Sequence, residues 1–253
     1  MADAYHADAS WRAKLRRRAV RLAARRPARA PRRPMVSFAF DDVPASAARE
    51  GAAILEARGL KGTFYVAAAL AGADAVTGPM ALAEDARRLA AAGHEIGCHT
   101  FSHQYGTGVA SAVLESDTTR NQAFIAEVLG DYRLSSFAYP YGDVSPRTKR
   151  LFGRRFATSR GIRRGVNGDL IDLAQLKAIG LEHQAWRPER IERAVETAAR
   201  SNGWIIFFTH DVSETPSRFG ATPEMLDHAL ACVRAAGIDI LPVKHALARA
   251  AFQ

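Results

Sequence analysis

The sequence predicts an α/β protein built on one parallel sheet, either open or closed into a barrel. Short apolar segments typical of strands alternate with helix-like segments from Met35 onward, in about seven units. Connections of this kind are right-handed and place the strands parallel. No stretch rich in Pro, Gly or Ser divides the units, and 253 residues with 48% hydrophobic side chains can bury one large core. We therefore expect a single domain over residues 34–253, preceded by a basic helical extension over residues 1–33.

Each expected element has a local reason in the sequence. The strands are short apolar runs, and we place them at residues 35–40, 62–66, 95–98, 136–139, 156–158, 178–181, 204–209 and 238–241. The helices are longer, and we place them at residues 45–58, 80–92, 109–129, 146–152, 188–201, 223–236 and 244–251. Glycines end the first three helices, at Gly59, Gly93 and Gly130, and prolines begin three later ones, at Pro146, Pro188 and Pro223.

The net charge of +9 comes from the first residues of the chain. Residues 12–33 contain 11 Arg or Lys and no acidic residue, whereas residues 34–253 contain 24 basic and 24 acidic side chains. Because the body is neutral, it provides no electrostatic argument for a specific nucleic-acid partner.

The basic segment resembles an amphipathic helix. Its apolar face carries Trp11, Leu15, Ala19 and Leu22, and Pro27 ends the pattern. Three interpretations stay open: a solvated extension, a helix lying on the anionic inner face of a membrane, and non-specific binding of RNA. The segment lacks the apolar region of a secretory signal and the chain has only two cysteines, so we expect a cytoplasmic protein with peripheral membrane contact as one role of the helix.

Polar residues follow four of the expected strands. These residues are Asp41-Asp42, His99 and His103, Pro140-Tyr141-Gly142, and His210-Asp211. The carboxyl ends of parallel strands meet at one edge of a sheet, where α/β proteins place their active sites. We therefore expect these side chains to form one site.

One carboxylate and two imidazoles would make a catalytic metal site. His99 and His103 are four residues apart, so one helical turn would bring both rings to one side. Three protein ligands leave coordination positions open for water and substrate, and this ligand set suits Zn, and also Co, Ni, Mn or Fe. Asp41 and Asp42 alternate in direction, so one could bind the metal while the other acts as a base, or the pair could simply form a turn. A histidine at the same edge, His210, is the candidate general acid, and we expect Cys98 to pack in the core.

These segments resemble the polysaccharide deacetylase family, which carries the NodB-homology domain (carbohydrate esterase family 4). The matching segments read FAFDDVP at 38–44, HTFSH at 99–103, FAYPYG at 137–142 and FTH at 208–210, and they span residues 35–243 of the body. The resemblance implies a distorted (β/α)7 barrel. It also implies a metal-dependent hydrolase that removes N-acetyl groups from N-acetylglucosamine-type sugars in an oligo- or polysaccharide.

The resemblance also assigns roles at matching positions. It makes Asp42, His99 and His103 the metal ligands, Asp41 the general base, His210 the general acid and the Tyr141 backbone N–H the oxyanion donor. Aromatic residues near the expected rim could stack on sugar rings, namely Phe101, Tyr105, Tyr139 and Trp186. Among residues near the motifs, we expect Pro140, Tyr139 and Phe101 to contact the carbohydrate substrate.

The sequence departs from the family pattern at two places. The third motif often carries an arginine oriented on the base, and Ala138 occupies that position here. The fourth motif, with its aspartate and tryptophan, has no clear match. Lys177 is the candidate for the missing positive charge, and Asp169 or Asp172 for an aspartate that orients the acid. Three rival functions stay open: a deacylase of another amide or ester, a non-catalytic carbohydrate-binding homologue, and a non-haem iron oxygenase, which the parallel α/β pattern and the doubled aspartate disfavour.

Overall fold

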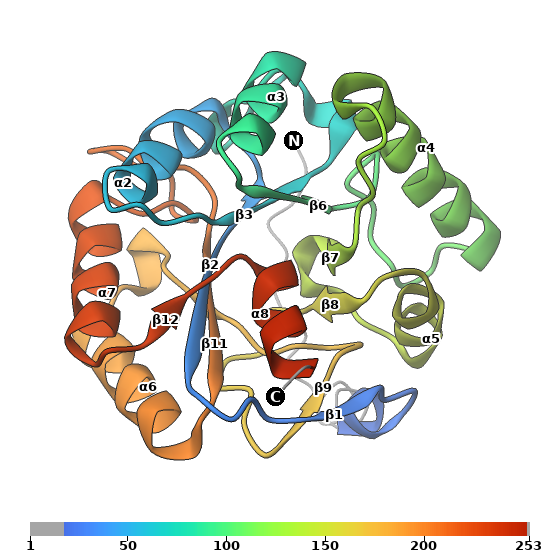
Figure 1. Ribbon diagram of the computed structural model, residues 1–253. Coiled ribbons are helices and arrows are strands. Elements are labelled where there is room, and N and C mark those ends of the chain that lie inside the picture. The colour runs from blue at the N-terminus through green and yellow to red at the C-terminus, as the bar shows by residue number, and fades with distance from the viewer. Residues whose placement is uncertain (1–17, 252–253) are drawn as a thin grey trace.

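Strands and helices alternate along the chain and curl into an incomplete barrel. The computed structural model describes residues 18–251. Its main sheet has the strand order β10-β11-β2-β3-β6-β7-β8, with β12 beside β2, and every ladder in it is parallel. Helices α2 to α7 surround the sheet, and α8 lies within its ring in the view of Figure 1. The predicted distorted (β/α)7 barrel is confirmed.

The elements follow the predicted order with small shifts at their ends. The strands of the main sheet are β2 (Met35–Asp42), β3 (Thr63–Val66), β6 (Glu95–Cys98), β7 (Ser136–Ala138), β8 (Thr158–Arg160), β10 (Ile179–Gly180), β11 (Trp204–Thr209) and β12 (Asp239–Ile240). The helices are α2 (Ala52–Glu56), preceded by a π-helical turn at Ala47–Gly51, then α3 (Ala83–Ala91), α4 (Ser111–Leu129), α5 (Pro146–Arg155), α6 (Pro188–Ser201), α7 (Pro223–Ala235) and α8 (Val243–Ala251). A short hairpin of β4 (Asp74–Ala75) and β5 (Gly78–Pro79) was not predicted. No helix in residues 18–251 is long and apolar enough to cross a membrane.

The barrel is irregular between β8 and β10, where no ladder joins the two strands. The chain at residues 173–178 fills this gap. The Ser159 N–H donates to the Leu173 carbonyl at 2.7 Å, and the Leu176 N–H donates to the Ser159 carbonyl at 2.8 Å. Arg160 forms an isolated bridge with Leu176. Irregular backbone therefore supplies the hydrogen bonds that a further strand would otherwise make.

The described part of the basic segment packs on the body, which corrects the predicted boundary at residue 33. β1 (Pro27–Arg29) pairs antiparallel with β9 (Leu170–Asp172), and Val20 is buried. The Lys149 ammonium donates to the Val20 carbonyl at 3.0 Å. Proline is tolerated here because β1 is an edge strand. Residues 18–33 are thus a docked part of the domain, while the predicted helix positions Trp11 and Leu15 lie outside the described residues.

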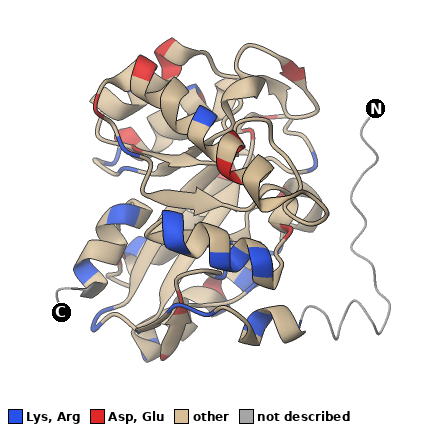
Figure 2. Cartoon of the chain, turned by 90° about the vertical axis from the view of Figure 1, so that its right-hand side faces the viewer, with Lys and Arg blue, Asp and Glu red and all other residues tan. Residues whose placement is uncertain are grey.

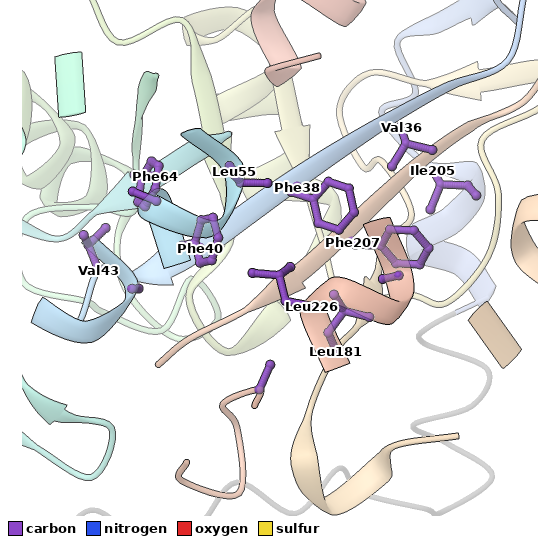
Figure 3. Packing of buried hydrophobic residues seen from close by; sticks show 14 of the residues in the cluster. Val36, Phe38, Phe40, Val43, Leu55, Phe64, Leu181, Ile205, Phe207 and Leu226 are labelled. Carbon is purple, nitrogen blue, oxygen red and sulfur yellow. The ribbon is translucent and has the colours of Figure 1, made fainter. Parts of the chain in front are cut away.

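Side chains alternate along β2 between two apolar layers. Val36, Phe38 and Phe40 belong to the outer cluster, between the sheet and the surrounding helices. Figure 3 shows Phe38 beside Phe207 of β11, with ring centroids 5.5 Å apart, and Leu226 of α7 near both. Burial of this apolar area holds the sheet against the helices. The alternate side chains of β2 point into the barrel.

The inner cluster fills the barrel and leaves little free space. It contains Tyr65, Trp204 and Phe208, together with Val243 from α8. Gly97 on β6 permits this packing, because a Cβ there would lie 2.5 Å from the ring of Tyr65. These side chains and α8 therefore close the lower end of the barrel, which is the end opposite the carboxyl ends of its strands.

Glu95 connects α8 to the lower end of the barrel. Its buried carboxylate accepts hydrogen bonds from the Ser136 hydroxyl (2.7 Å), the Thr63 hydroxyl (2.9 Å) and the Lys244 backbone N–H (2.8 Å). Burial raises the pKa of Glu95, and these bonds oppose the shift. Removing a buried acceptor leaves its donors unsatisfied.

We expect Glu95→Ala to lower the free energy of unfolding by about 3 kcal/mol, because it leaves buried donors without an acceptor. Urea denaturation at neutral pH measures the change. Glu95→Gln is the matched control, since it keeps the volume and one acceptor oxygen, and it should cost less. Equal stability of Glu95→Ala and the wild type would show that α8 does not depend on this carboxylate.

Candidate metal centre and active site

The inward-facing positions bring the polar residues to the carboxyl end of the barrel. Asp41 follows the inward Ala39 by two residues on β2, and His210 follows the inward Phe208 by two residues at the end of β11. His99 comes directly after β6. Asp41 is 4% exposed and His99 is 2% exposed. The sheet thus gathers the predicted site residues by its alternation.

Asp42, His99 and His103 converge on a common point. The Oδ1 atom of Asp42 lies 3.3 Å from Nε2 of His99 and 3.1 Å from Nε2 of His103. One ligand atom from each residue lies within 4.8 Å of the other two. The structure therefore brings together the three predicted metal ligands.

The first histidine is held in the form that a metal requires. Nδ1 of His99 lies 2.8 Å from the Ala138 carbonyl oxygen, an acceptor, so this nitrogen carries the proton and Nε2 presents its lone pair to Asp42. Burial lowers the pKa of His99 to about 4, and the nearby carboxylates only partly oppose this shift. The imidazole is neutral at physiological pH and can act as a ligand.

The second histidine reaches the site from a loop, which corrects the predicted helical turn. Residues 99–103 are irregular, and Thr100 and His103 have φ angles of 61° and 52°. Among the described residues, five of the eight non-glycine positions with positive φ lie at this site, namely Asp42, Val43, Thr100, His103 and Tyr141. Such strained backbone concentrates at functional sites, where the surrounding structure maintains it.

The Asp42 carboxylate fits a bound cation. Its Oδ1 is buried and has no hydrogen-bond partner among the described residues, although two imidazole nitrogens face it. Ligand atoms around a divalent metal lie roughly 3.0–3.4 Å apart, close to the distances found here. A carboxylate and two imidazoles form a donor set for Zn²⁺ and related ions.

Asp41 forms a buried ion pair with Arg160, a residue that the sequence analysis missed. The Arg160 guanidinium donates to Oδ1 of Asp41 and is fully buried. Burial alone would raise the pKa of Asp41, but the charges of Arg160, His99 and His210 outweigh it, and the pKa lies below its usual value. A base with this pKa is ionised throughout the neutral range.

Arg160 replaces the arginine that the family pattern places at Ala138. The two residues face each other across β7 and β8. The Arg160 guanidinium lies 5.2 Å from the centroid of the Tyr65 ring and 4.8 Å from the centroid of the Phe208 ring. Lys177, the predicted source of the charge, instead donates to the Val166 carbonyl at 2.7 Å, so that prediction is wrong. Extending the predicted strand at 156–158 by two residues would have placed Arg160 at the strand end.

His210 is close enough to Asp41 to interact with it electrostatically, and one nitrogen of its ring is directed at the backbone. Its Nδ1 is 3.3 Å from the Phe219 carbonyl oxygen, which leaves Nε2 available. Neither aspartate predicted to orient it does so: Asp172 pairs with Lys149 at 2.7 Å, and Asp169 is exposed. Besides Asp41, Glu182 also interacts electrostatically with His210, and its pKa is raised by burial and lowered in part by His210.

Tyr141 packs against His103, one of the three predicted metal ligands. Its ring centroid lies 4.4 Å from that of His103, and it stacks on Tyr105 at 4.0 Å. Its φ of 57° turns the backbone within the short 3-10 helix at Pro140–Gly142. The role of its N–H as an oxyanion donor stays a prediction.

The other residues that were expected to contact the substrate differ in their environments. Tyr139 is 1% exposed, its hydroxyl donates to the Ala174 carbonyl at 2.9 Å, and the prediction that its ring contacts a sugar is wrong. Pro140 is buried as well. Phe101 is half-buried and carries the Arg120 guanidinium 4.1 Å above its ring.

Comparison with known families agrees with this geometry. The family profile described as Polysaccharide deacetylase matches residues 28–155, which contain Asp41, Asp42, His99 and His103. The chain belongs to the polysaccharide deacetylase family. Comparison with curated protein sequences returned no match.

Solved structures similar to this polysaccharide deacetylase family member establish the fold. A family 4 acetyl xylan esterase from Clostridium thermocellum in complex with a cobalt ion is 21% identical, with a TM-score of 0.60 over 85% of this chain and 90% of that one. The chitin deacetylase of Colletotrichum lindemuthianum is 16% identical, with a TM-score of 0.62 over 87% and 90%. A pseudoenzyme of carbohydrate esterase family 4 from Bacillus anthracis is 15% identical, with a TM-score of 0.61 over 86% and 66%.

Proposed function

We propose that this protein is a metal-dependent hydrolase that removes N-acetyl groups from N-acetylglucosamine-type sugars in an oligo- or polysaccharide. The observation that carries the proposal is the convergence of Asp42, His99 and His103 beside an ionised Asp41, with His210 at the same edge of the barrel. A member of the polysaccharide deacetylase family that keeps all five residues retains the groups needed for amide hydrolysis.

Asp42, His99 and His103 would hold the metal, with Zn²⁺ as the best candidate and Co²⁺, Mn²⁺, Ni²⁺ or Fe²⁺ as alternatives. When bound, such an ion polarises a carbonyl oxygen and lowers the pKa of water. The Nδ1 hydrogen bond of His99 to Ala138 fixes the ring that would hold it.

The residues around this centre divide the proton transfers between them. Asp41, ionised and oriented by Arg160, accepts the proton of the attacking water. The Tyr141 N–H donates to the oxyanion that develops from the acetyl carbonyl. His210 gives its Nε2 proton to the sugar nitrogen as the C–N bond breaks, so that acetate and a free amino sugar result.

We expect the purified protein to release acetate from N-acetylglucosamine oligomers, to lose this activity on treatment with a chelator, and to regain it when Zn²⁺, Co²⁺ or Mn²⁺ is added back. An enzymatic acetate assay measures the release, and His99→Ala serves as the inactive control because it removes one ligand. Release that survives complete metal removal would contradict the metal-dependent mechanism.

The acyl acceptor distinguishes the proposal from its alternatives. One similar structure is an acetyl xylan esterase, which favours testing O-acetylated xylan beside the N-acetylated oligomers. Release from xylan alone would point to ester hydrolysis at the same site. Tight metal binding without release from either substrate would favour a non-catalytic carbohydrate-binding homologue.

We also propose that the protein works in the cytoplasm, in peripheral contact with the inner membrane face. Basic residues support this: Figure 2 shows Lys and Arg gathered on the lower half of the molecule and most Asp and Glu on the upper half. The helix α5, with the sequence PRTKRLFGRR, is strongly basic, and Arg150 and Arg154 are exposed on it. Each basic side chain near an anionic surface contributes about 1 kcal/mol.

We expect the full chain to co-sediment with vesicles that contain anionic lipid, and to be released as salt is raised. The double variant Arg150→Glu/Arg154→Glu should weaken binding, because it reverses two charges on this face. Arg87→Glu on α3 is the matched control and should leave binding nearly unchanged. Equal binding to neutral and anionic vesicles would contradict electrostatic docking.

A further inference from the structure

A second group of potential metal ligands lies between two outer helices, away from the inward-facing site. Figure 1 shows α6 and α7 side by side on the outside of the barrel. Glu192 extends from α6, while His228 and Cys232 lie one turn apart on α7. Because residues four apart share a helix face, the imidazole and the thiol point the same way.

These three side chains meet at one imidazole nitrogen. Nε2 of His228 lies 3.6 Å from Oε1 of Glu192 and 3.5 Å from Sγ of Cys232. All three ligand atoms lie within 4.8 Å of one another. A single Nε2 can donate to the carboxylate or accept from the thiol, but it cannot do both, and 3.6 Å is longer than an ordinary N–H···O bond.

The same spacings suit a tetrahedral ion. Around Zn²⁺, with Zn–N near 2.0–2.1 Å and Zn–S near 2.3 Å, nitrogen and sulfur ligands lie about 3.6 Å apart, and nitrogen and carboxylate oxygen lie about 3.4 Å apart. The distances of 3.5 Å and 3.6 Å at His228 are close to these values. The ring of His228 is also held by an edge-to-face contact with Trp186, at a centroid distance of 5.7 Å.

We propose that Glu192, His228 and Cys232 form a second divalent-metal site, selective for Zn²⁺-like ions, that links α6 to α7. On binding, the Cys232 thiol releases its proton to solvent and an Sγ–metal bond forms. The thiolate and the Glu192 carboxylate together balance the charge of the ion, and water completes the tetrahedron. The side chains of His228 and Glu192 are 33% and 52% exposed, so an ion can enter directly from solvent.

Cobalt spectroscopy separates this site from the Asp42 centre, because only a cysteine ligand gives a thiolate-to-Co²⁺ charge-transfer band in the near ultraviolet. We expect the wild-type chain to bind one Co²⁺ at each site and to show this band. Cys232→Ser should lose the band and one bound ion while retaining acetate release. His99→Ala should lose the other ion and retain the band.

Two further measurements complete the test. Cys98→Ser removes the other thiol, which is fully buried, and should keep the band. Zn²⁺ should raise the Tm of His99→Ala, and this increase should vanish when Cys232→Ser is added, because the link between α6 and α7 is lost. Absence of the band in the wild type, or its persistence in Cys232→Ser, would overturn the proposal whether or not the protein is a deacetylase.

Discussion

Replacing Asp41 with Asn is expected to lower kcat for acetate release at least about a hundredfold, the typical contribution of a general base. Asn keeps the shape of Asp but cannot accept the water proton. Metal content should stay at the wild-type level, because Asp42, His99 and His103 are unchanged. Acetate release and elemental analysis of the same sample measure both quantities.

The matched control is Asp42→Asn, which alters the neighbouring carboxylate. This variant should lose metal as well as activity, since the Asp42 oxygen faces both imidazoles. The pair therefore separates a base from a ligand at adjacent positions. Full activity of Asp41→Asn would reject the assignment of the base. Loss of metal from that variant would indicate that Asp41 is the ligand and Asp42 the base.

Removing Arg160 is the second change with a large expected effect. Burial raises the pKa of the Asp41 carboxyl, and removing the guanidinium takes away the largest charge that opposes this shift, so the pKa rises. Asp41 must be ionised to act as a base, so the acidic limb of the pH–rate profile for Arg160→Ala should move to higher pH. At a given pH below both pKa values, the activity of the variant should be lower than that of the wild type by about tenfold for each unit by which the Asp41 pKa has risen. Breaking a buried pair should also destabilise the protein by about 3–5 kcal/mol.

A charge placed on the neighbouring strand tests whether this effect is specific. Ala138 and Arg160 are register partners, and Ala138 belongs to the inner cluster. The double variant Ala138→Arg/Arg160→Ala should therefore move the acidic limb back toward its wild-type position. If Arg160→Ala and the wild type share one acidic limb, Arg160 stabilises the fold without controlling the base.

Much of this arrangement could be predicted from the sequence, because alternation and strand ends are local properties. The apolar run before Asp41-Asp42 predicts a buried strand, and the parallel sheet then gathers the polar residues at one end. The same reasoning placed His99 and His210 correctly. It left the roles of Asp41 and Asp42 open, because residue spacing contains no information about Arg160.

The missed features depend on contacts between segments far apart in the chain. Arg160 lies 119 residues from Asp41, and β1 pairs with β9 across more than a hundred residues. The His99–His103 spacing fitted a helix, but the positive φ of Thr100 turns the chain into a loop. Periodicity reports local conformation, whereas these features arise from tertiary packing.

The closed lower end of the barrel determines how a polymer can meet the protein. Tyr65, Glu95 and α8 occupy the interior, so no sugar chain can thread through the axis. In the proposed deacetylase reaction, a polymeric substrate would therefore approach the carboxyl end of the barrel from outside, with its backbone across the opening and one acyl group directed inward. Reactant and both products would then exchange through the same opening.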